Sequence, residues 1–161
     1  MTDIKVGHGY DVHKLVPDRK HVLGGVEINH DAGLLGHSDA DVLTHAVCDA
    51  LLGALGKRDI GYHFPDTDDA FRDICSLRLL ENVGKMIEND GYKVSNIDAT
   101  VIAQSPKLCP YIERMEKNIA SSLGISPDRV NIKATTEEGL GISGSGEAMA
   151  AYAVANVISK Q

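Results

Sequence analysis

The chain has 161 residues, of which 43% are hydrophobic, and a formal net charge of -7 at pH 7. This length fits one hydrophobic core, so we expect a single domain over residues 1–161. The negative charge, without a basic stripe, argues against a nucleic-acid partner, because phosphate backbones bind clustered Lys and Arg side chains. No stretch has the roughly 18 consecutive apolar residues of a membrane span, and no export signal is visible, so a soluble protein is expected.

The N-terminal region predicts strands. Residues 4–13 and 20–28 alternate apolar and polar side chains and are separated by a Val-Pro-Asp-Arg segment at 16–19. They therefore predict a hairpin or a pair of early strands. The two glycines at 24–25 interrupt the second run and predict a bulge.

A helix is expected over about residues 40–55, with Ser38 or Asp39 as its N-cap and its end near Gly56. Most of its surface is apolar, so it should be largely buried. Buried ionisable groups need partners or a metal. The helix nevertheless carries a polar stripe with a spacing of four residues, formed by Asp41, His45 and Asp49.

The rest of the chain predicts further helices and strands. Helices are expected over residues 72–89 and 110–123, and strands over residues 93–104 and 130–134. Residues 147–154 are alanine-rich enough for a helix, yet Tyr152, Val154, Asn156 and Ile158 alternate as in a strand, so the pattern leaves both open. The three cysteines are widely spaced and show no pairing pattern. We expect them to be small buried side chains in a protein of a reducing compartment: Cys48, Cys75 and Cys109.

Asp11, His13 and His45 are candidate metal ligands. Alternation along a strand places Asp11 and His13 on one face, and His45 can supply a third ligand. One carboxylate and two imidazoles with an open fourth position form the ligand set of a catalytic zinc. The alternative is a hydrogen-bonded core pair plus an unrelated helix histidine. Asp41 and Asp49 are candidates to orient His45 from behind.

Three other segments offer groups for binding. His37 and Ser38 precede a helix, where free amides favour an anion, although an ordinary N-cap explains them equally well. Residues 64–68 (Phe-Pro-Asp-Thr-Asp) read in isolation as a plain turn. Residues 133–141 contain two hydroxyls, adjacent carboxylates and glycines that suit Mg²⁺ with a phosphate, or simply a capped strand end. The glycines at 141–146 do not form a dinucleotide fingerprint.

In order and spacing, six motifs resemble the 2-C-methyl-D-erythritol 2,4-cyclodiphosphate synthase family over nearly the whole chain. They are Gly-Tyr-Asp-Val-His at 9–13, Gly-His-Ser-Asp-Ala-Asp at 36–41, Asp-Ile-Gly at 59–61, Phe-Pro-Asp-Thr-Asp at 64–68, Ala-Gln-Ser-Pro-Lys-Leu at 103–108 and Lys-Ala-Thr-Thr at 133–136. The resemblance implies an α+β fold with helices on one face of a mixed four-stranded sheet. It also implies a homotrimer whose sheets pack around the three-fold axis, with active sites between subunits, and it favours a C-terminal strand.

The resemblance further implies a metal-dependent phosphorus–oxygen lyase of the non-mevalonate isoprenoid pathway. Its substrate would be 4-diphosphocytidyl-2-C-methyl-D-erythritol 2-phosphate, and its products the cyclic diphosphate and CMP. No protein nucleophile is needed, because the substrate's own 2-phosphate attacks the β phosphorus. Such an enzyme would be cytoplasmic in a bacterium, or stromal in a plastid once a transit peptide has been removed.

The resemblance also assigns site residues by position. Asp11, His13 and His45 would hold Zn²⁺, Glu138 would face a Mg²⁺ or Mn²⁺ that bridges the substrate phosphates, and His37 and Thr136 would stabilise the transition state. The remaining substrate-binding positions are Ser38, Asp59, Ile60, Gly61, Phe64, Pro65, Asp66, Thr67, Asp68, Thr135 and Glu137, with Ala103, Gln104, Ser105, Pro106, Lys107, Leu108 and Cys109 forming the cytosine pocket.

Two positions depart from the family pattern. Many members have an aromatic residue at the position of Ile142 and an arginine at the position of Ser145, where they line a cavity on the trimer axis. The loss of a cation there argues against binding of an anionic ligand in that cavity. Two rival functions are a zinc-dependent phosphodiester hydrolase and a zinc-stapled trimeric binding module.

Overall fold

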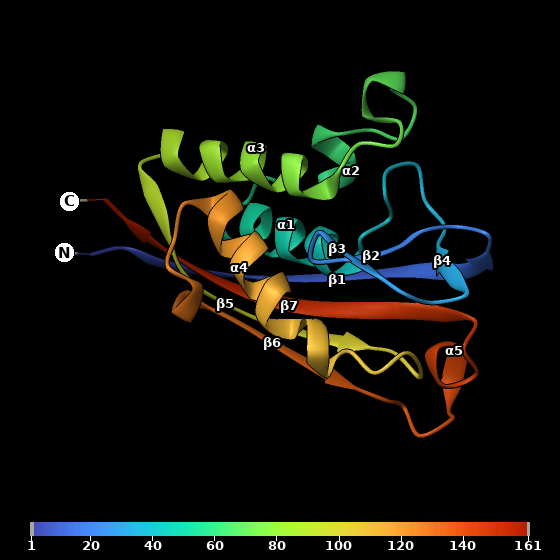
Figure 1. The fold of residues 1–161 in the computed structure, drawn as a ribbon. Coiled ribbons are helices and arrows are strands. Elements are labelled where there is room, and N and C mark those ends of the chain that lie inside the picture. Colours follow the sequence, from blue (N-terminus) through green and yellow to red (C-terminus); the bar gives the residue numbers. More distant parts are fainter. Residues whose placement is uncertain (1, 161) are drawn as a thin grey trace.

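A computed structural model describes residues 2–160, which form a five-stranded sheet with helices packed on one face (Figure 1). The strand order is β4-β1-β7-β5-β6, and β2 and β3 form a separate two-stranded sheet. The strands are β1 (Ile4–Pro17), β2 (His21–Leu23), β3 (Val26–Ile28), β4 (Ala32–Leu34), β5 (Tyr92–Ile102), β6 (Val130–Thr135) and β7 (Ala148–Ser159). The helices are α1 (Val42–Ala54), α2 (Ile60–His63), α3 (Ser76–Asn89), α4 (Ile112–Leu123) and α5 (Gly141–Gly144).

The α+β class and the mixed sheet are confirmed, but the expected number of four strands is wrong. β5 and β6 are parallel, whereas the other pairs in the main sheet are antiparallel. The fifth strand is β4, which pairs with the last residues of β1 from Leu15 to Pro17. It has only three residues, too few for alternation along the chain to reveal it.

Residues 20–28 form a hairpin of their own instead of one bulged strand. Gly24 and Gly25 have φ angles of 53° and 67° and connect Leu23 to its partner Val26. Two consecutive positive φ angles suit a tight two-residue turn, and glycine adopts them without steric cost. The bulge prediction is therefore wrong, and so is the alternative in which this segment pairs with β1.

Helix α1 begins one residue after Asp41, which replaces both predicted caps. The Asp41 carboxylate accepts the backbone N–H of Thr44 at 3.0 Å and also the N–H groups of Gly24 and Gly25 at 2.9 and 2.8 Å. Its side chain is fully buried. The hydrogen bonds of Asp41 thus join the β2–β3 hairpin to the start of α1.

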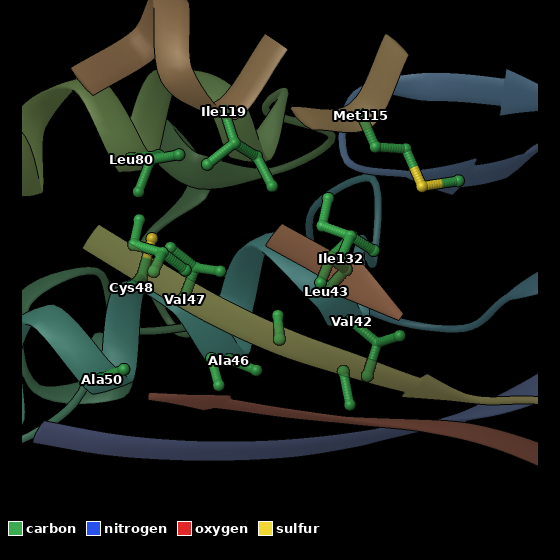
Figure 2. Packing of buried hydrophobic residues seen from close by; sticks show 14 of the residues in the cluster. Val42, Leu43, Ala46, Val47, Cys48, Ala50, Leu80, Met115, Ile119 and Ile132 are labelled. Carbon is green, nitrogen blue, oxygen red and sulfur yellow. The ribbon is translucent and has the colours of Figure 1, made fainter. Parts of the chain in front are cut away.

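Two glycines let α1 lie directly on β1. A Cβ atom at Gly7 would be 1.9 Å from the carbonyl oxygen of Ala50, and one at Gly9 would be 1.9 Å from that of Ala46. Figure 2 shows α1 enclosed between the sheet and the layer of α3 and α4, with Val47 below Leu80 and Ile119. The prediction that this helix is largely buried is confirmed, and the close approach brings His45 down to β1.

The C-terminal run is a strand, as the resemblance indicated, and β7 lies between β1 and β5. Ala151, Ala153 and Ala155 are buried toward the helices, where small side chains fit beneath α1. Tyr152 and Val154 point the opposite way and are each 44% exposed. The other sheet face also exposes Ile4, Val6, Tyr10 and Val12.

The remaining elements match their predictions within a few residues. The ends of α3 and α4 are followed by left-handed glycines, Gly91 and Gly124, as the sequence indicated. Of the cysteines only Cys48 is buried, so the expectation of burial is wrong for Cys75 and Cys109. Within residues 2–160, no helix has the length and apolar character to cross a bilayer.

Candidate metal centre and substrate pocket

Asp11, His13 and His45 converge at one point between β1 and α1. Asp11 Oδ2 lies 2.9 Å from His13 Nε2 and 3.0 Å from His45 Nδ1, and the two nitrogens are 3.2 Å apart. Donor atoms of a tetrahedral zinc site lie about 3.3 Å apart, given zinc–ligand bonds of about 2.0–2.2 Å. The three atoms are therefore spaced as ligands of one small cation. Among residues 2–160 they form the one cluster of this kind.

His13 is held in the tautomer that frees its inner nitrogen. Its Nδ1 lies 2.7 Å from the carbonyl oxygen of Leu35, which can only accept a hydrogen bond, so Nδ1 carries the proton. Nε2, which faces Asp11, then keeps its lone pair free to bind a metal. A backbone carbonyl behind a ligating histidine is a common orienting group in metal sites.

His45 is oriented by two serines and not by the predicted Asp41 and Asp49. Its Nε2 lies 2.8 Å from Ser76 Oγ and 3.1 Å from Ser38 Oγ. Ser76 donates its own hydroxyl proton to Asp39 in a short hydrogen bond, so Ser76 accepts from His45 and leaves Nδ1 as the ligand. Asp49 instead accepts the backbone N–H of Ile60.

The charges of Asp11 and His13 act in opposite directions on cation binding. Burial alone would raise the pKa of Asp11, but hydrogen bonds from His13 and His45 outweigh burial and hold its pKa well below its usual range. Burial lowers the pKa of His13, yet its hydrogen bond with the Asp11 carboxylate gives a net increase. Because a metal binds neutral imidazole, protonation of His13 competes with it, and metal affinity should fall as the pH falls.

The triad opens into a pocket of about 390 Å³. Its walls include His37 and Ser38 from the segment before α1, together with side chains from the loop after that helix. Predicted substrate residues in the lining are Asp11, His13, His37, Ser38, Ile60, Gly61, Phe64 and Asp66. The structure thus brings together the motifs at 9–13, 36–41, 59–61 and 64–68.

Four other predicted residues stand beside this pocket. Asp59 caps α2 by accepting the N–H of Tyr62 at 2.9 Å. The carbonyl oxygen of Asp68 lies 3.2 Å from Nε2 of His37. Pro65 and Thr67 belong to the same turn, in which the Pro65 carbonyl accepts the N–H of Asp68.

The motifs at 103–109 and 135–138 form a second group that is separate within one chain. Ala103 N–H donates to the carbonyl oxygen of Thr135 at 3.0 Å, which joins the two loops. Register places His13 opposite Met149 and Ile102 opposite both Ala150 and Thr135. Both groups therefore lie at the same end of the sheet, two strand steps (about 10 Å) apart at the 103–109 loop and three steps (about 14 Å) apart at Thr135.

The second group is largely exposed. Gln104, Ser105, Lys107 and Cys109 are exposed, Pro106 is half-buried, and Leu108 packs into the core. Thr136 Oγ1 donates to Glu138 Oε1 at 2.9 Å, whereas Glu137 accepts the hydroxyl proton of Ser143. Ile142 and Ser145 lie in and just after α5, and both are exposed. None of these residues lines the pocket beside the triad.

Sequence reasoning missed six groups that shape the site. Ser76 and Asp39 orient His45, the Leu35 carbonyl orients His13, and Phe71, Ile74 and Leu79 complete the pocket wall. Ser76 is 31 residues from His45 and has no periodic relation to it. In the structure Ser76 is the first residue of α3, and a serine before an apolar run signals at most a helix start, not a histidine partner.

Replacing Ser76 with alanine is expected to weaken zinc binding by about 10- to 100-fold, because His45 loses the acceptor that fixes its tautomer. The variant should remain folded, since only one hydroxyl is removed. Competition with a chelating dye measures the zinc affinity. Ser122→Ala, which removes a hydroxyl bonded only to the Asn118 carbonyl, is the matched control and should bind zinc as the unmodified chain does.

Comparisons with known proteins agree with the six motifs. The YgbB family model matches residues 4–158. A relative from Lachnospira eligens, named 2-C-methyl-D-erythritol 2,4-cyclodiphosphate synthase, is 62% identical over 156 residues, which are 97% of this chain and 85% of that protein.

Solved structures show the same fold. The bifunctional IspDF from Campylobacter jejuni matches with a TM-score of 0.95 and 42% identity, over 99% of this chain and 43% of that longer protein. A structure titled as the CDP complex of IspF from Plasmodium falciparum has a TM-score of 0.86 and 35% identity, covering 98% of this chain and 97% of its own. The chain therefore belongs to the YgbB family, together with relatives named 2-C-methyl-D-erythritol 2,4-cyclodiphosphate synthase.

Proposed function

We propose that this chain converts 4-diphosphocytidyl-2-C-methyl-D-erythritol 2-phosphate to 2-C-methyl-D-erythritol 2,4-cyclodiphosphate and CMP, in the non-mevalonate route to isoprenoid precursors. The high identity to a synthase over nearly the full chain supports this reaction. The observation that carries the proposal is the Asp11, His13 and His45 cluster opening into a pocket lined by His37 and Ser38.

The donor set fits Zn²⁺. Two imidazoles and a carboxylate leave a fourth tetrahedral position, and both histidines are oriented by groups behind them. When bound, zinc would supply a Lewis acid that holds and partly neutralises a substrate phosphate oxygen. Asp11, His13 and His45 are its proposed ligands.

The chain's own groups position a reaction that the substrate carries out on itself. A 2-phosphate oxygen forms a bond to the β phosphorus, the bond from that phosphorus to the bridging oxygen breaks, and CMP leaves with that oxygen. The nucleophile is already an anion, so no protein base is required. His37 and Ser38 lie in the pocket wall, where they can donate hydrogen bonds to phosphate oxygens that gain charge.

Residues of the second group are proposed to hold the cytidyl diphosphate part. Glu138, whose carboxylate accepts a hydrogen bond from Thr136, would hold a Mg²⁺ or Mn²⁺ that partly neutralises the diphosphate of the substrate. Thr135, Thr136 and Glu137 lie in the same segment. The loop from Ala103 to Cys109 would receive the cytosine through backbone groups. The P. falciparum relative was solved as a CDP complex, which supports a cytidine nucleotide as ligand.

We also propose that three copies assemble, with each site between neighbours. The triad pocket and the 103–109 loop do not share one pocket within a chain, and a neighbouring copy that brings its own 103–109 loop to the triad pocket would complete the site. The sheet face opposite the helices exposes an apolar surface that an assembly would cover: Ile4, Val6, Tyr10, Val12, Tyr152 and Val154.

Mixtures of inactive chains test this sharing. His13→Ala removes a proposed zinc ligand and Glu138→Ala removes the proposed Mg²⁺ ligand of the second group, so each variant alone should be inactive or nearly so. If the two parts come from different protomers, trimers reassembled from a 1:1 mixture should recover about a quarter of the sites, because random mixing restores both parts at one site in four. Activity no higher than the sum of the separate variants would show that each site lies within one chain.

The reaction itself is tested by ³¹P NMR. Incubation of the cytidyl substrate with the protein, Zn²⁺ and Mg²⁺ should give the signals of the cyclic diphosphate and CMP. A linear phosphate product would instead support the rival hydrolase, in which the same triad activates water. The cyclic product would exclude the non-enzymatic binding module at the same time.

A further inference from the structure

Three consecutive carbonyl groups in the segment between β4 and α1 are each bonded by a distant part of the chain. One guanidinium nitrogen of Arg19, Nη2, donates to the Gly36 carbonyl at 2.9 Å and to the Ser38 carbonyl at 2.8 Å. Between them, the His37 carbonyl accepts the backbone N–H of Asp73 at 2.9 Å. The segment has no regular secondary structure, so it lacks the backbone hydrogen bonds of a helix or sheet. These three contacts hold its backbone instead.

This segment touches each histidine in the pocket. Gly36 packs against the His13 ring, to which an added Cβ would come within 3.0 Å. Ser38 Oγ contacts His45 Nε2, and the ring of His37 lies in the pocket wall beside the Asp68 carbonyl. A shift of the 36–38 backbone would therefore displace His37 and loosen the support of the two histidines among the proposed zinc ligands.

The position of Arg19 is itself fixed by close packing. It lies in the turn between β1 and β2, and Gly33 of β4 allows that turn to approach: a Cβ at Gly33 would be 2.3 Å from the Arg19 carbonyl oxygen. Within residues 2–160, the side-chain hydrogen bonds of Arg19 all go to the 36–38 segment. The side chain is half-buried and borders an open cavity of about 310 Å³, which Ser38 and Asp39 also line.

We propose that Arg19 is a positioning residue for the cyclisation. It bridges the carbonyls on either side of His37, so that the imidazole is held toward the substrate phosphates while Ser38 stays on His45. Arg19 reaches no substrate itself and acts through the backbone of residues 36–38. This inference rests on the role of His37 in the proposed function.

Arg19→Ala in the zinc-loaded enzyme should therefore lower kcat by roughly 10- to 100-fold with little change in KM, because a small misplacement of a positioned group is costly in the transition state. The vacated space opens to the 310 Å³ cavity, so millimolar guanidinium should restore part of kcat, whereas sodium at equal ionic strength should not. Lys20→Ala is the matched control. It removes the same charge from the adjacent residue, whose exposed ammonium pairs only with Glu27, and it should leave kcat unchanged.

A second readout does not depend on turnover. The ring resonances of His37 should be sharp in the unmodified enzyme, broadened by exchange in Arg19→Ala, and sharpened again by guanidinium. If Arg19→Ala fails to fold, Arg19→Gln takes its place, because the shorter amide cannot bridge both carbonyls. Unchanged kcat and unchanged His37 resonances in a folded variant would overturn the inference, and so would a loss of kcat matched by Lys20→Ala. If the unmodified enzyme gives no cyclic product, the proposed function is refuted instead. The His37 resonances would still test whether Arg19 holds the 36–38 backbone in place.

Discussion

Replacing His45 with alanine is expected to abolish stoichiometric zinc binding and to lower kcat by at least about 1000-fold. The triad would keep one imidazole and one carboxylate, and two protein ligands hold a catalytic zinc poorly. His45 is also the member that bridges the metal centre to Ser38 and Ser76, so its loss removes the orienting network as well. Turnover with saturating substrate and zinc content after dialysis measure the two effects.

The His45→Ala protein should nevertheless fold and assemble. Helix α1 is held by its buried apolar side chains and by Asp41, none of which is a proposed zinc ligand. We expect a loss of about 1–3 kcal/mol, since two buried hydroxyls lose a partner. His30→Ala, which changes a histidine outside the pocket lining, is the control and should retain zinc and activity. An unfolded His45→Ala beside a folded control would favour a zinc that staples the structure.

The second large effect is expected at Gly9, which contacts no metal ligand directly. An alanine Cβ there would lie 1.9 Å from the Ala46 carbonyl oxygen and 2.7 Å from the Ala50 nitrogen, so α1 must move away from β1. His45 immediately precedes Ala46 and moves with it, while Asp11 stays on β1. Gly9→Ala should thus destabilise the protein by about 3 kcal/mol and weaken zinc binding at the same time.

Gly53→Ala is the matched control for this change. It makes the same substitution on α1, where the nearest atom to the new Cβ would be the His8 carbonyl oxygen at 3.7 Å, an ordinary contact. Alanine is favoured over glycine within helices by up to about 1 kcal/mol, so this variant should be as stable as the unmodified chain or more so. Thermal unfolding and zinc titration of the pair measure both effects. Equal behaviour of Gly9→Ala and Gly53→Ala would contradict the close contact between α1 and β1.

The sequence was sufficient to identify Asp11, His13 and His45 as candidate ligands. It could not explain why the helix that carries His45 lies so close to the strand that carries the other two. Alternation placed Asp11 and His13 on one strand face, and the structure agrees. That His45 reaches them follows from Gly7 and Gly9, whose lack of side chains acts only through a tertiary contact. Motif resemblance pointed to eight of the residues that line the pocket, whereas the predicted residues at 103–109 and 135–138 do not line it.

Features that depend on distant partners were predicted poorly. Asp41 shares a helix face with His45, yet its carboxylate is occupied by the glycine turn at 24–25, and no local pattern shows that bond. Ser76 takes the orienting role from another helix. Strand β4 exists because the end of β1 offers it hydrogen bonds, which three residues of sequence cannot reveal. The alanines of β7 fit a helix pattern and a strand pattern equally well. The strand forms because β1 and β5 supply its hydrogen bonds and its small side chains fit beneath α1.

An isotope measurement tests most directly whether the substrate's own 2-phosphate, and not water, attacks the phosphorus beside the triad. The reaction is run in water enriched in ¹⁸O, and the masses of the products are measured by mass spectrometry. Attack by the substrate's own 2-phosphate transfers no solvent oxygen, so the cyclic diphosphate and CMP should both be unlabelled. Incorporation of ¹⁸O into either the released nucleotide or the erythritol phosphate would mean that water is the nucleophile, which would contradict attack by the substrate's own 2-phosphate.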